Sequence, residues 1–357
     1  MSAARVVVLG ASGGVGARVV RSVSAVPGVE VLGASRSGRG AGGERLERID
    51  VRDPATLALA VREGDLVVNC VGPFHYDPAP LVASCVAAGA HYCDLADDPA
   101  FAERARRAAR GGDAAARGVF VCTGASTVPG LVGVLASALA ASPRAPEIAR
   151  VSVYLSVGSA NPVSAGLLAS LLAPLGRALP GAARCFGSLR ALRTSAGRTL
   201  RFGSYPAAFE HGALILGARS VPVHFAFGFD RAALTALLRA LAPLLARIPP
   251  LAFARLAPAL LPFARVAQLF GTPLGVLVVV AEGGGGEEIA RLELAARAHG
   301  LDVPAAPPAF IAARLARGEQ LRAGSAELHE LVPLADVLSW VRSRPELSLG
   351  ASGSVAL

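Results

Sequence analysis

The sequence predicts an α/β protein in which a doubly wound parallel sheet is followed by a second, α+β domain. Three observations predict it: a buried strand that runs into a glycine-rich turn, three Asp-Pro dipeptides before alanine-rich helices, and a change of texture near residue 126. The chain has 357 residues, of which 53% are hydrophobic and 17% charged. That composition excludes intrinsic disorder, and the length suits two domains.

The N-terminal segment reads as one complete β-α-β unit. An apolar strand at 5–9 is followed by glycines, by a helical pattern over 15–26 and by a second strand at 29–34. A near-continuous apolar run is what a parallel strand buried on both faces requires. Further strands are expected at 44–50, 65–70, 91–95 and 118–122.

Each Asp-Pro dipeptide marks the start of a helix between two of these strands. Aspartate is a favoured N-cap, and proline is favoured at the first helical position. The dipeptides begin at Asp53, Asp77 and Asp98, in register with the strands. Their alternation predicts a doubly wound domain over residues 1–125.

From residue 126 the strands are grouped apart from the helices, which is typical of an α+β domain. We expect this domain over 126–304, and we expect two helical patterns in 305–357 to pack back on the first domain. Its expected strands are 150–158, 199–205, 218–229, 274–283 and 289–298, and its expected helices are 129–142, 163–178 and 230–270.

The segment 230–270 is rich in Ala and Leu and contains five prolines. Arg231, Arg239, Arg247 and Arg255 follow one another at steps of eight residues, and such a step rotates about 80° around a helix, so they form no single stripe. Two interpretations stay open: short helices at an oligomer interface, or an apolar channel or membrane-contacting element.

All 35 basic residues are arginine, which excludes a Schiff-base lysine, a lysine general base and a P-loop lysine. The formal net charge is +9, and residues 126–304 carry 16 Arg against 8 acids. A basic second domain favours an anionic substrate, an acidic carrier protein or a membrane surface. Nucleic acid is not expected as a partner, because the arginines are spread singly and few aromatic residues accompany them.

The five cysteines show no C-x-x-C spacing, so neither a disulfide framework nor a metal site is expected. A reducing compartment and a cytoplasmic location are the expectation, since the N-terminus runs directly into a strand without a signal-peptide pattern. Polar residues and prolines interrupt the charge-free stretches 118–143 and 151–176. We therefore expect no transmembrane segment, while peripheral membrane contact stays open.

The turn between the first strand and its helix has the sequence GASGGVG. Glycines there permit a tight turn and let a pyrophosphate approach the backbone at the helix N-terminus. At the strand-to-helix junction of a full β-α-β unit, this pattern predicts a dinucleotide site. The expected contacts in this turn are Gly10, Ser12, Gly13, Gly14, Val15 and Gly16.

The end of the second strand predicts which dinucleotide binds. An acidic residue there would hold the ribose 2′-hydroxyl of NAD, but no acid occurs before Glu44. Arg36 instead has the position and charge for a 2′-phosphate, with Ser35 beside it. NADP(H) is the expected cofactor.

The ends of the third and fourth strands would complete the site, because ligands bind at the carboxyl edge of such sheets. Asp50 and Val51 are expected near the adenine. A Gly-Pro turn after the fourth strand would bring backbone against the ribose or nicotinamide. The residues expected there are Asn69, Val71, Gly72 and Pro73.

Three segments together resemble the saccharopine dehydrogenase-like (saccharopine reductase-type) NADP-binding oxidoreductases: GASGGVG at 10–16, NCVGPFHYDPAPLVASCVAAGAHYCDLADDPAF at 69–101, and CTGASTVPGL at 122–131. The resemblance implies a Rossmann-type doubly wound sheet, an α+β substrate and dimerisation domain, and a homodimer. It also implies hydride transfer to a C=N, C=C or C=O bond of a small or carrier-linked metabolite.

Candidate catalytic groups lie near the expected nicotinamide. Tyr76 or His75 would protonate a developing anion or amine, and Asp94 would hold a cationic imine or amine by its charge. Of His91 and Tyr92, which alternate along a strand, one is expected to face the core. The alternative function is a nucleotide-binding protein without turnover, whose basic, apolar second domain contacts lipid or protein.

Overall fold

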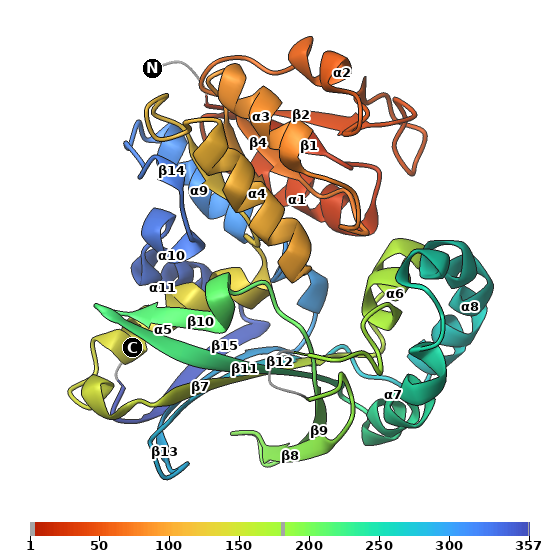
Figure 1. The fold of residues 1–357 in the computed structure, drawn as a ribbon, viewed down its shortest axis with the longest axis vertical. Coiled ribbons are helices and arrows are strands. Elements are labelled where there is room, and N and C mark those ends of the chain that lie inside the picture. Colours follow the sequence, from red (N-terminus) through yellow and green to blue (C-terminus); the bar gives the residue numbers. More distant parts are fainter. Residues whose placement is uncertain (1–3, 180–182, 356) are drawn as a thin grey trace. The chain divides into compact units, whose positions relative to one another are not determined.

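A computed structural model describes residues 4–179, 183–355 and 357. The chain divides into two compact units, each made of two separate stretches of sequence (Figure 1). Unit 1 comprises the chain up to Val134 together with Leu301–Asp336, and unit 2 comprises Leu135–Gly300 together with Val337–Leu357.

The sheet of unit 1 has seven strands in the order β14-β6-β5-β4-β1-β2-β3, and all its neighbouring pairs are parallel. The order reverses at β1, so the crevice between β1 and β4 is the switch point where ligands bind in such sheets. The strands are β1 (Ala4–Leu9), β2 (Val29–Ser35), β3 (Glu47–Arg48), β4 (Leu66–Asn69), β5 (His91–Asp94), β6 (Phe120–Cys122) and β14 (Gly324–Ser325).

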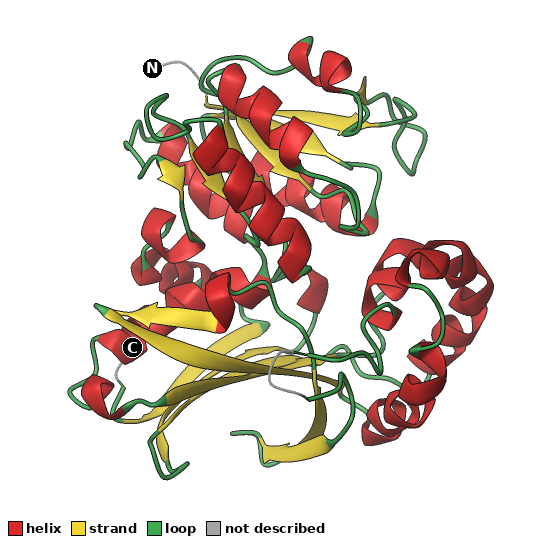
Figure 2. Ribbon diagram, viewed as in Figure 1, coloured by secondary structure: helices red, strands yellow, loops and turns green. Residues whose placement is uncertain are grey.

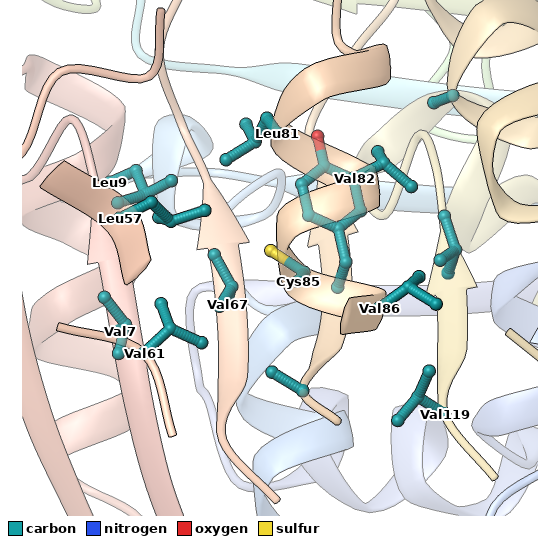
Figure 3. Close-up of a cluster of buried hydrophobic side chains, with 14 of the residues drawn as sticks. Val7, Leu9, Leu57, Val61, Val67, Leu81, Val82, Cys85, Val86 and Val119 are labelled. Atoms are coloured by element: carbon teal, nitrogen blue, oxygen red, sulfur yellow. The ribbon is translucent and has the colours of Figure 1, made fainter. Parts of the chain in front are cut away.

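Helices cover both faces of this sheet. On one face α2 (Pro54–Ala58), α3 (Ala79–Ala87) and α4 (Pro99–Gly111) pack on a core of Val, Leu and Ala side chains (Figures 1 and 3). On the other face α1 (Gly14–Ser24) packs beside α9 (Pro307–Ala316). The predicted doubly wound α/β fold is thus confirmed.

The Asp-Pro signals act largely as predicted. The Asp53 carboxylate accepts from the backbone N–H of Ala55, and the Asp98 carboxylate accepts from that of Phe101. Asp77 lies one residue outside the N-cap of α3, yet its carboxylate still accepts from Ala79 N–H. The strand expected at 44–50 shrinks to the two exposed residues of β3, because they lie at the edge of the sheet and bury no side chain.

Unit 2 is built on an eight-stranded mixed sheet with the path β15-β13-β12-β7-β11-β9-β8, and β10 pairs with β11 (Figure 2). Among the strand pairs of this sheet that the structure describes, β7 with β11 is parallel and the others are antiparallel. The strands are β7 (Arg150–Val157), β8 (Leu189–Arg193), β9 (Thr199–Ser204), β10 (Ala213–Leu216), β11 (Arg219–Phe229), β12 (Gly275–Glu282), β13 (Glu288–Ala296) and β15 (Leu347–Gly353).

The helical region 230–270 is divided into α7 (Ala232–Leu245) and α8 (Phe253–Gln268), with a short 3₁₀ turn at Pro250–Ala252 between them. The break falls at Pro249-Pro250, where two successive residues lack a backbone donor. A third helix, α6 (Ala165–Leu172), packs against α8. The remaining helices are α5 (Val132–Ala140), α10 (Leu328–Leu331) and α11 (Leu334–Arg342).

The prediction that 305–357 returns to the first domain is wrong for its last part. Residues up to Asp336 belong to unit 1, where β14 extends the sheet beside β6. The rest joins unit 2, because β15 pairs antiparallel with β13, from Leu347 beside Ala296 to Gly353 beside Ala290. That pairing satisfies the edge of β13 with backbone hydrogen bonds.

Candidate active site

The turn after β1 brings backbone against backbone. Gly10 has a positive φ of +79°, and a Cβ there would lie 3.0 Å from Val71 Cγ2 and 3.1 Å from the Cys70 carbonyl oxygen. A Cβ on Gly16 would overlap the Gly10 carbonyl oxygen. By contrast, a Cβ on Gly14 would meet only the tip of Arg18, at 3.9 Å. Gly16 is therefore required for the approach of α1 to the end of β1, and Gly10 for the approach of this turn to the loop after β4.

The N-terminus of α1 is open to an anion. Gly13 is the N-cap, in extended conformation, and no side chain caps the helix. The first intrahelical bond is the one that Ala17 N–H donates to the Gly13 carbonyl, so the N–H groups of the preceding turn have no helical acceptor. Together with the helix dipole, this arrangement fits a pyrophosphate. Ser12 and Val15, both half-buried, border the turn.

At the end of β2 one expected contact is occupied and the other is free. The buried Ser35 hydroxyl donates to the Arg39 carbonyl (3.0 Å) and accepts from Arg39 N–H (3.1 Å), so it shapes the loop. Arg36 is exposed, and within the described residues its guanidinium has no hydrogen bond or ion pair. The Arg36 guanidinium is therefore available to pair with a 2′-phosphate, whereas the Ser35 hydroxyl is already hydrogen-bonded to Arg39.

The end of β3 offers a weaker contact. The Asp50 carboxylate accepts from Arg52 N–H at 3.0 Å, and the Asp50 backbone N–H donates to the Thr56 hydroxyl. Val51 is half-buried and packs against the core beneath the sheet. Both residues lie beside the carboxyl edge of β2, where an adenine would be expected, since β2 and β3 are parallel neighbours.

Asn69, the last residue of β4, is fully buried and its side chain is fully used. Its amide Nδ2 donates to the hydroxyls of Tyr76 (2.8 Å) and Tyr92 (3.0 Å), while its Oδ1 accepts from Val71 N–H (3.1 Å). The amide of Asn69 is thus bonded within the chain and holds the following loop, and a contact between Asn69 and the cofactor stays a prediction. Gly72, next in that loop, has open space where a Cβ would lie.

Tyr76 and His75 follow Pro73 in the same loop. The Tyr76 hydroxyl also lies 3.1 Å from Asn69 Oδ1, and its ring packs edge-on against Phe101. Burial raises the pKa of Tyr76 well above its usual value, so the phenol keeps its proton at neutral pH. His75 Nε2 is buried without a hydrogen-bond partner among the described residues, which leaves it available to a bound group.

Asp94, at the end of β5, is completely buried. Its Oδ1 accepts from the Thr123 hydroxyl (2.9 Å), Gly124 N–H (2.8 Å) and Ala96 N–H (3.0 Å). Burial raises the pKa of the Asp94 carboxyl, although these hydrogen bonds lower it in part. Through Oδ1 the carboxyl joins the ends of β5 and β6, while its buried Oδ2 has no hydrogen-bond partner among the described residues. That Asp94 holds a cationic imine or amine by its charge stays a prediction.

His91 and Tyr92 both turn out to be structural. Tyr92 is fully buried, as expected for one of the alternating pair. His91 stacks on Phe120, with ring centroids 4.3 Å apart, and its Nδ1 accepts from Phe120 N–H. Burial lowers the pKa of His91 to about 4, so the imidazole is neutral at neutral pH.

Sequence reasoning missed the part played by Thr123 and Gly124, the two residues directly after β6. Their only signal was their place at the carboxyl end of a predicted strand next to the one that ends at Asp94. Among residues 4–179, 183–355 and 357, no group of three His, Cys, Asp or Glu side chains is arranged to hold a metal ion.

Comparison with known proteins agrees with this geometry. Residues 6–119 match the family described as saccharopine dehydrogenase NADP binding domain. Over this stretch unit 1 is therefore similar to saccharopine dehydrogenase NADP binding domains. The matched stretch begins within β1 and ends just before β6, so it holds the glycine turn, Arg36 and the Gly72-Pro73 loop.

The curated relatives match only part of the chain, between about a quarter and a third of its length. A probable mitochondrial saccharopine dehydrogenase-like oxidoreductase of Arabidopsis thaliana is 33% identical over 113 residues, which is 31% of this chain and 24% of that protein. The saccharopine dehydrogenase-like oxidoreductase of Mus musculus is 33% identical over 88 residues, or 24% of this chain and 20% of that one. The chain thus matches less than a quarter of the length of these relatives.

The fold extends over both units. Apo saccharopine dehydrogenase (L-Glu forming) from Saccharomyces cerevisiae superposes with a TM-score of 0.63, covering 98% of this chain and 99% of that one at 13% identity. The Rossmann-type sheet with a second, mixed-sheet domain is therefore shared with that protein. At this identity the similarity concerns the fold alone.

Proposed function

We propose that this chain is an NADP(H)-dependent oxidoreductase that transfers a hydride to or from a C=N, C=C or C=O bond of a small or carrier-linked metabolite. The observation that carries the proposal is the cradle at the β1–α1 turn, where Gly10 and Gly16 leave no room for a side chain and the end of α1 has no cap. That cradle lies in a domain of NADP-binding type.

The residues that would hold the cofactor divide by what they offer. The turn from Gly10 to Gly16 offers backbone N–H groups to the pyrophosphate, and Arg36 offers a free guanidinium to the 2′-phosphate. The loop at Gly72-Pro73 offers uncovered backbone at the switch point. When bound, NADPH would supply a hydride; the protein positions the partners and handles the proton.

Tyr76 is the proton donor we favour. Its phenol stays protonated, and Asn69 fixes it through both amide atoms. His75, one residue earlier, would accept a hydrogen bond from the substrate or donate one to it through its unpartnered Nε2. Asp94 acts one step further away, because its hydrogen bonds to Thr123 and Gly124 set the neighbouring strand ends.

The substrate is proposed to be anionic, since 126–304 carries twice as many arginines as acids. A homodimer in the cytoplasm remains our prediction for the assembly and its location. Light scattering at several protein concentrations measures the first, and a fluorescent fusion observed in cells measures the second.

The test has two stages. The dissociation constants of NADPH and NADH are measured first, with NADPH expected to bind more tightly. Oxidation of NADPH is then followed with a panel of imines, ketones and enoyl thioesters that carry acidic groups. Tyr76→Phe is expected to lower kcat about 100-fold or more while NADPH binding stays unchanged.

Tyr154→Phe is the matched control, because this tyrosine belongs to the core of unit 2. Tight NADPH binding without turnover across the whole panel would instead favour a nucleotide-binding protein that acts through contacts of unit 2. An unchanged kcat in Tyr76→Phe would remove Tyr76 from the chemistry.

A further inference from the structure

The α7–α8 region of unit 2 leaves large apolar side chains in solvent. Of the thirteen exposed large hydrophobic residues among those described, nine lie between residues 237 and 270. Phe263, Leu269 and Phe270 are 74%, 80% and 70% exposed. So dense a group is unusual on a water-soluble surface and marks a place of contact.

These side chains follow the helix period. On α7, Leu237, Leu241 and Leu244 recur at i, i+4 and i+7 and share one side of the helix. On α8, Leu256 and Phe263 are seven residues apart, and Phe270 continues the spacing just after the helix. We call Leu256, Phe263, Val266, Leu269 and Phe270 the α8 face.

The opposite side of α8 is packed within unit 2. Phe253 and Ala257 are buried, and the Gln268 side chain donates to the Asn161 carbonyl at 2.9 Å. These contacts, with the packing of α6 on α8 seen in Figure 1, fix the helix in the fold. The α8 face is thus the outer side of an anchored helix, and its apolar side chains are not buried by the rest of the chain.

The charges in this region are all of one sign. Between Asp230 and Glu282 the sequence has five arginines and no acidic residue. Arg239, Arg247, Arg255 and Arg265 are exposed, and none of the four has a hydrogen bond or ion pair with any residue that the structure describes. Arg255 and Arg265 border the α8 face, so a partner must offer both apolar material and negative charge.

A second copy of the chain would supply the apolar contact but not the negative charge. In a two-fold dimer the α8 face would pack on itself and bring Arg255 and Arg265 toward their counterparts, with no acid between Asp230 and Glu282 to pair with them. A membrane containing anionic lipids supplies both. Its headgroups pair with arginine, and its acyl boundary takes up Leu and Phe side chains.

Length and composition alone would also let Pro250–Gln268 cross a bilayer, and within the described residues it is the only helix of which this is true. Crossing would require the packed side of α8, with Phe253 and Ala257, to separate from unit 2. It would also carry Arg255 and Arg265 into hydrocarbon. A helix lying in the interface needs neither change.

We propose that the α8 face and its bordering arginines dock this protein, peripherally and reversibly, on membranes that contain anionic lipids. The proposal concerns where the protein works and does not depend on the reaction proposed above.

Flotation of the full chain with lipid vesicles tests it. Vesicles of phosphatidylcholine alone are compared with vesicles in which part of it is replaced by phosphatidylglycerol, at low and at high salt. We expect binding only to the anionic vesicles and release at high salt. Phe263→Ser/Phe270→Ser and Arg255→Glu/Arg265→Glu should each weaken binding about tenfold or more.

Matched controls lie outside the region. Leu59→Ser removes an apolar side chain that is 91% exposed in unit 1, and Arg21→Glu/Arg342→Glu makes the same change of net charge. Both controls should bind vesicles like the wild type. Unchanged NADPH affinity and thermal midpoint in all the variants would show that they fold.

Three results would overturn the proposal. Equal binding to neutral and anionic vesicles removes the role of the arginines. Retention in high salt and alkaline carbonate indicates a spanning helix. Absence of vesicle binding, with a dimer that Phe263→Ser/Phe270→Ser dissociates, assigns the α8 face to contact between two copies.

Discussion

The two halves of the carboxyl edge of the unit 1 sheet use their polar groups in opposite ways. After β4 and β5, Asn69, Tyr76 and Asp94 are bonded to neighbours within the unit. After β1 and β2, the N-terminus of α1 has no cap and Arg36 has no partner among the described residues. The first half is a frame of mutually bonded side chains that, within the part of the chain that the structure describes, leaves only His75 Nε2 and Asp94 Oδ2 without partners, whereas the second half presents unbonded donors.

This difference shows how a binding site can be recognised before a ligand is seen. Polar side chains at strand ends attract attention in a sequence, but here most of them satisfy one another. The groups without a protein partner among the described residues are backbone N–H groups, the Arg36 guanidinium, His75 Nε2 and Asp94 Oδ2. Their lack of protein partners distinguishes them from the frame.

The largest expected effect comes from adding a methyl group at Gly16, in the turn between β1 and α1. Gly16→Ala places a Cβ against the Gly10 carbonyl oxygen, so β1 and α1 must separate. We expect a loss of about 4 kcal/mol in the free energy of unfolding and no measurable NADPH binding. Urea unfolding and NADPH titration measure both. Gly14→Ala, whose Cβ has room, should keep both properties, and equal damage in the two variants would contradict the steric argument.

The frame can be broken at Asp94. Asp94→Ala leaves Thr123 Oγ1 and the N–H groups of Gly124 and Ala96 without their acceptor, which should cost about 3 kcal/mol of unfolding free energy. Asp94→Asn keeps an oxygen in place and should cost about 1 kcal/mol. If Asp94→Asn were stable yet inactive with a cationic substrate, the charge of Asp94 would act directly on that substrate.

A substitution at the exposed Arg36 tests nucleotide preference without removing any hydrogen bond of Asn69, Tyr76 or Asp94. Arg36→Ala should weaken NADPH about 30-fold, equivalent to about 2 kcal/mol, and leave NADH unchanged. Fluorescence titration of both nucleotides gives the ratio. Arg21→Ala, which removes an exposed arginine from the last turn of α1, is the control. An unchanged ratio in Arg36→Ala would show that the 2′-phosphate is held elsewhere.

The smallest expected effect concerns how the free energy of unfolding depends on pH through His91. Because the pKa of His91 is lowered to about 4 in the fold, the unfolded chain binds a proton first as the pH falls. Stability should therefore decrease from about pH 6.5 toward pH 4, with His91 contributing about 2 kcal/mol between pH 7 and 5. His91→Asn offers Phe120 N–H an acceptor that does not titrate, and should reduce the loss by that amount in urea titrations.

Burial also lowers the pKa values of His224 and His329, so part of the acid loss should remain in His91→Asn. A variant whose stability falls as steeply as that of the wild type would exclude His91 as a source. NADPH affinity at neutral pH should be the same in both proteins, because His91 begins β5 and so lies at the opposite end of the strand from the carboxyl edge.

The unit 1 fold was predictable because its signals are local. Apolar runs, Asp-Pro helix starts and the glycine turn each depend on a few neighbouring residues. In unit 2, β8 and β15 escaped prediction because their residues bury little: β15 is rich in Gly and Ser, with its last residues exposed. Such segments become strands through pairing with a partner strand that local sequence does not specify.

The candidate site remains a prediction, and the sequence indicates its parts unequally. The position of the cofactor follows from backbone geometry, which glycines reveal. The roles of Asn69 and Asp94 follow from the register of β4, β5 and β6, which places Asn69 beside Asp94 and Cys93 beside Cys122. Without that register, a structural carboxylate and a substrate-binding one have the same sequence signature.

The way the chain passes between the units determines when each sheet can be finished. β14, an edge strand of unit 1, is made only after β7 to β13 of unit 2 have been translated, and β15, the eighth strand of the unit 2 sheet, comes later still. During synthesis on a ribosome, the unit 1 sheet is incomplete until β14 emerges, and the unit 2 sheet is incomplete until β15 emerges. Unit 1 therefore lacks an edge strand until most of unit 2 has been made, and unit 2 is completed last. A truncation after Asp336 removes β15 and exposes the edge of β13.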